Sequence, residues 1–167
     1  MRVVLLGGAP GVGKSTTARE LLRSASHGPI LVQWVEVDAL WSHQPWRVDE
    51  VTVAMLHSNL RAVMSNAAAA AVQVLIVTWV FQDTAMQNLL RQLAPEGSHI
   101  STVQLCMGET SWRQRFTADV TRPSIDQFFE DRYKQAQTTA ADHVVEVDGL
   151  APNEIAIAVS NAIGLRP

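Results

Sequence analysis

A glycine-rich turn near the start of the chain, GGAPGVGKSTT at positions 7–17, is the feature that most constrains the fold. It follows a short apolar run that predicts a strand, and it leads into TTARELLRS, which is typical of a helix. Gly8, Gly13, Lys14 and Ser15 match the spacing GxxxxGK[ST] of the phosphate-binding P-loop. This motif requires a strand before it and a helix after it, so the surrounding sequence supports the match.

The chemistry of such a turn comes from its backbone and from two side chains. Glycines let the chain curl so that successive N–H groups point at an anion, and the helix N-terminus adds partial positive charge. Lys14 is expected to reach the β- and γ-phosphates, and the Ser15 hydroxyl is expected to ligate Mg²⁺. We therefore expect binding of ATP with Mg²⁺ by the residues of this turn: Gly8, Ala9, Pro10, Gly11, Val12, Gly13, Lys14, Ser15 and Thr16.

Composition limits what can surround this turn. With 167 residues, of which 47% are hydrophobic and 17% charged, the chain suits one globular domain. No apolar run approaches the roughly 18 residues of a membrane span, and one cysteine, Cys106, cannot form a disulfide within the chain. The net charge of −3, without a basic stripe, disfavours a nucleic-acid partner. Because the first residues form the strand before the P-loop, we expect a cytoplasmic protein rather than an exported one.

Strand-like and helix-like segments alternate along the rest of the chain. The predicted strands are 3–6, 30–37, 72–77, 101–107 and 143–147. The predicted helices are 14–24, 49–71, 84–93, 109–120, 125–137 and 153–163. Nearly continuous apolar strands indicate a parallel sheet that is covered on both faces. The pattern predicts an α/β fold, a P-loop NTPase three-layer α/β/α sandwich with a five-stranded parallel sheet, as a single domain over residues 1–167.

Asp38, in the segment VEVDALW, follows the second predicted strand. It should lie at the carboxyl edge of the sheet and face the same crevice as the P-loop. A carboxylate there can bind Mg²⁺ through water, or accept the proton of a substrate hydroxyl during phosphoryl transfer. The alternative is that Asp38 only caps a following helix turn.

Several segments together resemble the small P-loop kinases. They are GAPGVGKST after a short strand, VEVDALW after the second strand, an arginine-bearing segment after the fourth, and ADHVVEVDGLAPNEIAIAV near the end. The chain is similar to the group of gluconate kinase, shikimate kinase and chloramphenicol phosphotransferase, whose fold is like that of adenylate kinase. The resemblance implies an ATP-dependent phosphotransferase that acts on a hydroxyl of a small molecule.

The resemblance also implies roles for particular residues. Asp38 would face the phosphoryl acceptor, and a short lid at about 109–124 would close over the phosphates. This lid carries the arginines Arg113, Arg115 and Arg122; we expect Arg115 near the adenine and Arg122 near the phosphates, the alternative being ordinary surface charges. The loop 147–152 would pass the adenine ring, with Asp148 and Gly149 placing its backbone.

Two features depart from related patterns. The third strand lacks the acidic residue that many P-loop proteins place at its end; Thr78 stands near that position, and gluconate kinases also lack an acid there. Asp83, five residues further on, fits better as the cap of the next helix. The triple-glycine signature of shikimate kinase is absent after this strand, which argues against shikimate as the acceptor.

The acceptor site is expected between Asp38 and the helix 49–71. Arg47 could pair with an acidic group of the substrate, or with Asp49 or Glu50 as a surface arginine. Tryptophans should gather at the same end of the sheet, which suggests an acceptor with an apolar or ring-shaped face: Trp41, Trp46 and Trp79.

Other functions stay open at this point. The acceptor could be a nucleotide or a nucleoside, and the protein could be a monomer or a homodimer. A different class is an ATPase or nucleotide switch that acts on a partner macromolecule. The guanine-specific motif NKxD needs an Asn-Lys pair, and the chain contains none, which disfavours a GTPase. An ATPase of that class usually has further domains, for which 167 residues leave little room.

Overall fold

The computed structural model describes residues 1–165 and contains one sheet of five parallel strands. The strands are β1 (Arg2–Gly8), β2 (Val32–Glu36), β3 (Val74–Thr78), β4 (His99–Cys106) and β5 (His143–Glu146). Their order across the sheet is β2-β3-β1-β4-β5, so β1 lies at the centre with the P-loop at its carboxyl end. The five-stranded parallel sheet predicted from the sequence is confirmed.

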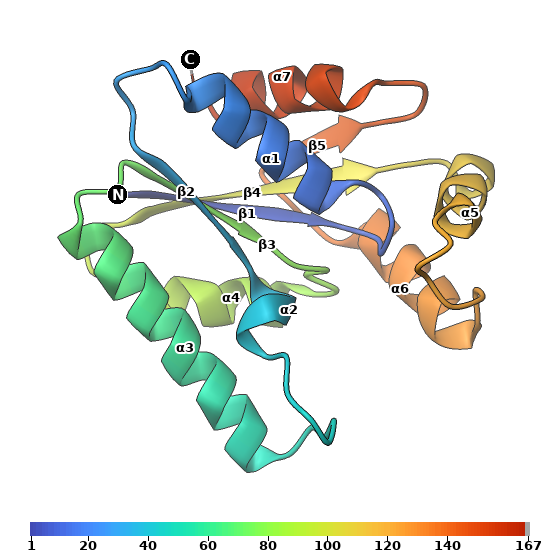
Figure 1. The fold of residues 1–167 in the computed structure, drawn as a ribbon, viewed down its shortest axis with the longest axis horizontal. Helices are drawn as coiled ribbons and strands as arrows, with labels where there is room; N and C mark the ends of the chain where they lie inside the picture. The colour runs from blue at the N-terminus through green and yellow to red at the C-terminus, as the bar shows by residue number, and fades with distance from the viewer. Residues whose placement is uncertain (166–167) are drawn as a thin grey trace.

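The helices form a layer on each face of this sheet (Figure 1). They are α1 (Lys14–Ala25), α2 (Val37–Leu40), α3 (Glu50–Ala69), α4 (Thr84–Leu93), α5 (Glu109–Ala118), α6 (Gln127–Thr138) and α7 (Pro152–Ala162). In Figure 1, α1 and α7 cover one face and α3 and α4 cover the other. The helices α5 and α6 lie beyond the carboxyl ends of the strands, next to the P-loop.

Alternating residues of β1 divide the apolar core in two. Val4 and Leu6 point into the cluster under α1 and α7, whereas Val3 and Leu5 point into the cluster over α3 and α4. All four side chains are at most 1% exposed. A strand that is buried on both faces reads as a continuous apolar run, which is why β1 could be recognised in the sequence.

The main local difference from the expected elements lies at the end of β2. The strand predicted at 30–37 ends at Glu36, and a short helix that the sequence did not predict, α2, begins at Val37. Val37 is completely buried in the α3 side of the core, so the chain turns inward at this residue. This turn decides where the following acidic residue, Asp38, lies.

Two helices begin directly after an aspartate that caps them. Asp49 and Thr52 form a reciprocal capping box at the start of α3. The Asp83 carboxylate accepts a 2.9 Å hydrogen bond from the Met86 N–H at the start of α4, which confirms its predicted role as a cap. Within residues 1–165, no helix combines the length and the apolar character needed to cross a bilayer.

Candidate active site

Gly8 and Gly13 of the P-loop have positive φ angles, which residues with a side chain rarely adopt. Gly8 has φ of +140°, and a Cβ atom there would lie 2.8 Å from the Leu105 carbonyl oxygen of β4. Gly13 has φ of +112° and immediately precedes α1. A side chain at either position would be strained, so the loop depends on both residues for its curvature.

The Lys14 side chain folds back onto the P-loop, which precedes it in the chain. Its ammonium group donates to the carbonyl oxygens of Gly8, at 2.9 Å, and Ala9, at 3.0 Å. Burial lowers the pKa of Lys14 from 10.5 to about 8, and the positive charge of Arg122 also lowers it. The carboxylates of Asp38 and Glu36 act in the opposite direction. Lys14 is therefore within electrostatic reach of an arginine and two acids.

The Ser15 hydroxyl donates a 2.5 Å hydrogen bond to the Glu36 carboxylate. Glu36 is the last residue of β2, and both residues are partly buried. Sequence reasoning missed Glu36 and selected only Asp38 from VEVDALW. Glu36 could have been found from its position in the sequence. An acid at the carboxyl end of a strand in a parallel sheet lies at the same edge of the sheet as the P-loop.

Thr78 is the last residue of β3, a strand that contains no acidic residue. It is paired in register with Glu36 on the neighbouring strand. The Thr78 hydroxyl accepts a 2.9 Å hydrogen bond from the Trp34 indole N–H and donates to the Val35 carbonyl oxygen at 3.4 Å. Thr78 is thus engaged within the sheet, and the carboxylate at this edge comes from β2 instead of β3.

Asp38 lies in the first turn of α2 and is accessible to solvent. The alternative that Asp38 caps this helix is wrong, because the N-cap position belongs to Glu36. Desolvation by the surrounding protein raises the pKa of Asp38, whereas Lys14 lowers it; Glu36 raises it further, and a hydrogen bond from the Trp79 side chain lowers it. A carboxylate that is open to solvent, close to a lysine and raised in pKa is suited to take up a proton.

The helix α5 is anchored to the outside of the P-loop by two aromatic residues. The Trp112 indole N–H donates a 2.7 Å hydrogen bond to the Pro10 carbonyl oxygen, and Trp112 is completely buried. A Cβ atom on Gly11 would lie 3.0 Å from the Phe116 ring. Tyr133 of α6 stacks on Trp112 with ring centroids 4.5 Å apart. The first part of the expected lid, 109–118, is therefore packed against the nucleotide loop.

The three arginines of this segment have different surroundings. Arg115 donates a 3.1 Å hydrogen bond to the Val12 carbonyl oxygen and so lies against the P-loop. Arg122 follows α5, pairs with Asp119 at 3.0 Å and lies over the Phe116 ring at 5.1 Å. Its positive charge lowers the pKa of Lys14, so Arg122 is within electrostatic reach of the P-loop lysine.

Arg113 forms ion pairs with acidic residues of two helices. Its guanidinium pairs with Glu109 at 2.8 Å and with Glu130 at 2.9 Å, which joins α5 to α6. Both pairs raise the pKa of Arg113. Of the three arginines, Arg113 is thus engaged between helices, Arg115 contacts the P-loop, and Arg122 acts on Lys14 through its charge.

The loop after β5 is tied to the loop after β4. The Asp148 carboxylate accepts a 2.7 Å hydrogen bond from the Gly108 N–H, and a hydrogen bond with the Ser111 side chain is the main cause that lowers the Asp148 pKa. Gly149 has φ of +71°, a turn conformation that favours glycine. These contacts place the loop 147–152; its predicted contact with adenine stays a prediction.

The acceptor side of the site contains the segment between α2 and α3. Trp41 packs edge-on against Trp46, with ring centroids 5.3 Å apart, and Trp46 is 57% exposed. Arg47 forms an ion pair with Asp49 at 3.1 Å, the surface pairing that the sequence left open. The predicted contact of Arg47 with a substrate stays a prediction.

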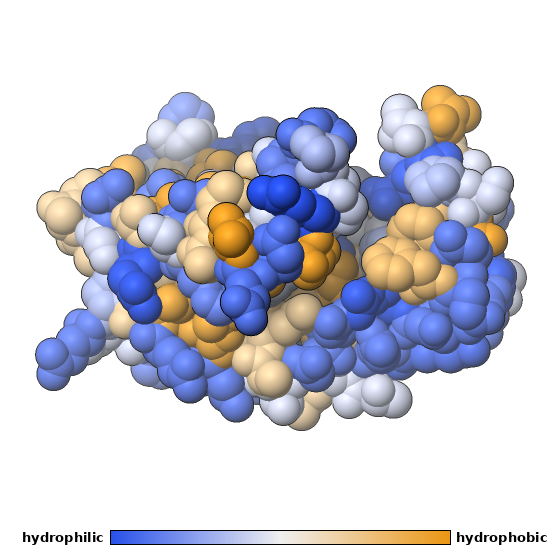
Figure 2. Space-filling view, turned by 90° about the horizontal axis from the view of Figure 1, so that it is seen from below, coloured by the Kyte–Doolittle hydropathy of each residue, from blue (hydrophilic) through white to orange (hydrophobic). Residues whose placement is uncertain are grey.

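Exposed apolar side chains occur on both sides of the site. From the α3 side come Trp46, Val48, Val51 and Met55, and from the α5 and α6 side come Val120 and Phe128. The space-filling view shows a hollow between the main body and the lobe of α5 and α6 (Figure 2). The structure therefore brings the P-loop, Glu36, Asp38, Trp79 and Arg122 to one edge of the sheet, with apolar surface on either side.

Solved structures resemble nearly the whole chain. A sugar kinase from Janibacter sp. has a TM-score of 0.72 and 16% sequence identity, and the match covers 100% of this chain and 96% of that one. The tunicamycin resistance protein of Deinococcus radiodurans has a TM-score of 0.69 and 22% identity, with 99% and 96% covered. A gluconokinase from Sinorhizobium meliloti has a TM-score of 0.66 and 15% identity, with 97% and 91% covered.

These likenesses confirm the P-loop kinase fold that the sequence predicted. No protein-family model matches the sequence, and no curated protein matches it at a significant level.

Proposed function

We propose that the protein transfers the γ-phosphoryl group of ATP to a hydroxyl group of a small molecule. The observation that carries this proposal is the position of Asp38, a solvent-accessible carboxylate whose charge acts directly on the P-loop lysine, Lys14. A nucleotide-binding protein needs the lysine alone, whereas a kinase also needs a base for the acceptor hydroxyl. The apolar surface on both sides of the site supports an acceptor with an apolar or ring-shaped face.

Two residues, one at the start of α1 and one at the end of β2, fit a bound Mg²⁺. The Ser15 hydroxyl and the Glu36 carboxylate already lie within hydrogen-bonding distance of each other, and both are the oxygen ligands that Mg²⁺ prefers. We propose that Ser15 binds the ion and that Glu36, rather than an acid on β3, supports it directly or through water. Asp38 was predicted as a further ligand, and this role stays an alternative to its role as base. When bound, Mg²⁺ would neutralise charge on the β- and γ-phosphates.

The transfer step follows from the side chains at this edge. The acceptor hydroxyl oxygen forms a bond to the γ-phosphorus while the bond from that phosphorus to the β–γ bridging oxygen breaks, and the electron pair leaves with ADP. Asp38 takes the hydroxyl proton and later releases it to solvent. Lys14 and Arg122 stabilise the charge that spreads over the transferring group, and Arg115 holds the nucleotide end of the P-loop.

The similar solved structures support this proposal. Two of them are named as a sugar kinase and a gluconokinase. We further propose that the enzyme is cytoplasmic, uses ATP and Mg²⁺, and works as a monomer or a homodimer without a nucleic-acid partner. These points follow from the composition and the resemblance described above.

ATP consumption measured with and without a panel of hydroxylated acceptors tests the function. The panel should contain sugar acids, nucleosides, nucleotides and aromatic or macrocyclic alcohols, because the acceptor side is apolar. Turnover that depends on one acceptor, with its phosphate ester identified by mass spectrometry, is the expected result. Hydrolysis of ATP that proceeds equally without any acceptor would favour the ATPase alternative. The Asp38→Asn variant is the matched control, since it retains the P-loop.

A further inference from the structure

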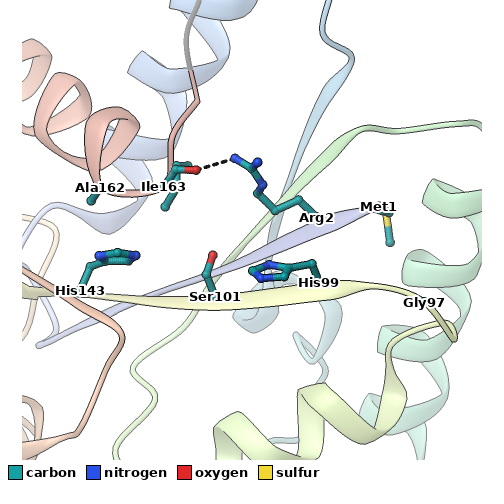
Figure 3. A pocket seen from close by; sticks show the side chains of 8 residues that line it. All are labelled: Met1, Arg2, Gly97, His99, Ser101, His143, Ala162 and Ile163. Carbon is teal, nitrogen blue, oxygen red and sulfur yellow. Dashed lines mark hydrogen bonds between the residues drawn. The ribbon is translucent and has the colours of Figure 1, made fainter.

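A cavity lined in part by polar side chains lies at the amino ends of the strands, opposite the P-loop. Its volume is about 430 Å³, and it is lined by Met1, Arg2, Gly97, His99, Ser101, His143, Ala162 and Ile163 (Figure 3). β1 runs from Arg2 at this cavity to Gly8 in the P-loop, a span of roughly 20 Å for seven residues of strand. The cavity is therefore separate from the site proposed above.

The polar side chains of this cavity come from three neighbouring strands. Arg2 of β1 is paired in register with His99 of β4, and Ser101 follows two residues later on the same face. His143 begins β5, the next strand. Figure 3 shows the two imidazole rings on either side of Ser101, with the Arg2 side chain above them. Four hydrogen-bonding side chains thus surround one space.

The Ser101 hydroxyl lacks a partner among the described residues. The residue is only 8% exposed, and its Oγ atom has no hydrogen bond within residues 1–165. Figure 3 shows this oxygen directed into the space between the histidines. An unpaired hydroxyl in the interior costs free energy, so a ligand that supplies a hydrogen bond here would be favoured.

The charge around the cavity suits an anion. Arg2 carries a permanent positive charge and five N–H donors, of which one donates to the Ile163 carbonyl oxygen. None of the eight described residues that line the cavity is acidic. Asp142, which precedes His143, is not among the lining residues; its carboxylate accepts hydrogen bonds from the Thr102 N–H and hydroxyl group and interacts electrostatically with His143. An anion in the cavity would have no carboxylate of the lining to repel it.

We infer that this cavity is a second anion site, which binds a tetrahedral oxyanion of the phosphate type through Arg2, His99, Ser101 and His143. A guanidinium group binds two oxygens of such an anion in one plane, and a hydroxyl and two imidazoles can reach the others. The volume of the cavity exceeds that of one phosphate group, so the anion can be inorganic phosphate or the phosphate of a small metabolite.

Titration followed by amide NMR tests this inference. Inorganic phosphate and glycerol 3-phosphate are added in separate experiments at constant ionic strength. The signals of Gly97, Ser101 and His143 should shift along saturating curves, and the probe with the lower Kd identifies the source of the anion. These three reporter residues lie at the opposite end of the sheet from Gly11 and Gly13 of the P-loop. Their signals therefore report on this cavity and not on nucleotide binding or phosphotransfer.

Substitutions then assign the binding to the named side chains. Arg2→Gln should raise the Kd of the tighter probe by about tenfold or more, and Ser101→Ala should raise it severalfold. Arg2→Lys, which keeps the charge, replaces Arg2→Gln if that variant does not fold, and should raise the Kd less. The control is Arg132→Gln, which removes a partly exposed arginine of α6 that does not line the cavity. Shifts that do not saturate, or a Kd that is the same in Arg2→Gln and Arg132→Gln, would overturn the inference.

Discussion

The hydroxyl of Ser15 and the carboxylate of Glu36 are joined by a 2.5 Å hydrogen bond that connects the first turn of α1 to the end of β2. The bond links the P-loop to a strand that is not its neighbour, since β3 lies between β1 and β2. Thr78 at the end of β3 is engaged with Trp34 and Val35, so the acidic group reaches the P-loop from one strand further away.

The first prediction concerns this pair. Glu36→Gln should raise the Mg²⁺ concentration needed for half-maximal phosphotransfer by roughly 10-fold or more, because supporting groups of a metal site typically contribute 10- to 100-fold. The measurement is the rate as a function of Mg²⁺ at saturating ATP. Asp83→Asn, at the residue that caps α4, is the control, and its Mg²⁺ requirement should stay near that of the unmodified protein. An unchanged requirement in Glu36→Gln would remove Glu36 from the metal site.

The second prediction concerns Asp38 as base. Asp38→Asn keeps the shape of the side chain but cannot accept the hydroxyl proton, so kcat with the acceptor should fall by about 10² to 10⁴. ATP affinity measured without Mg²⁺ should stay within a few-fold. If the main effect is instead a weaker affinity for Mg·ATP that extra Mg²⁺ restores, Asp38 is a metal ligand. Turnover equal to that of the unmodified protein would exclude both roles.

The third prediction concerns the protonation of Lys14. Its pKa of about 8 in the free protein means that the side chain is mostly neutral at pH 9 and charged at pH 6.5. Phosphates stabilise the ammonium form and raise the pKa again, so nucleotide binding at pH 9 should take up about one proton, and binding at pH 6.5 should take up none through this group. Calorimetry in buffers of different ionisation enthalpy measures the uptake. Lys14→Met is the control; equal uptake in that variant would assign the proton to another group.

The fourth prediction separates the arginines around α5. Arg122→Ala should lower kcat by roughly 10²-fold and ATP affinity much less, because charge on the transferring group develops in the transition state. Arg113→Ala is the matched control, since Arg113 pairs with Glu109 and Glu130, and its kcat should stay within a few-fold. Steady-state kinetics and direct binding of ATP give both quantities. A rise in KM for ATP alone would make Arg122 a ground-state contact and move the catalytic role to Arg115.

The fifth prediction concerns the anchor of the P-loop. Trp112→Phe removes the hydrogen bond to the Pro10 carbonyl oxygen and leaves that oxygen unpaired, which should lower the free energy of unfolding by about 1–3 kcal/mol. Denaturant unfolding measures this change. ATP affinity should also fall a few-fold, because Pro10 belongs to the loop that surrounds the phosphates. Trp46→Phe, at an exposed tryptophan, is the control; an equal loss of stability there would contradict the proposed anchor.

The sequence predicted the elements whose signals are local. The P-loop could be recognised from the spacing of its motif over eight residues. The strands of the sheet could be recognised from their continuous apolar runs. Asp83 could be assigned as a cap because a cap and its N–H partner are three residues apart. The end of β2 could not be placed in this way, since it depends on the burial of Val37 against α3.

By itself, the sequence determined the fold class, the phosphate loop and the edge of the sheet at which the site lies, because these depend on residues close together in the chain. Only the tertiary structure decided which acid meets Ser15, since Glu36 and Ser15 are 21 residues apart. In addition, β3 lies between β2, which carries Glu36, and β1, which leads into the P-loop. It also decided how Arg113, Arg115 and Arg122 differ, because the face of α5 that packs on the P-loop is chosen by the burial of Trp112 and Phe116. Long-range contacts such as these depend on strand order and on side-chain packing, which no local pattern in the sequence specifies.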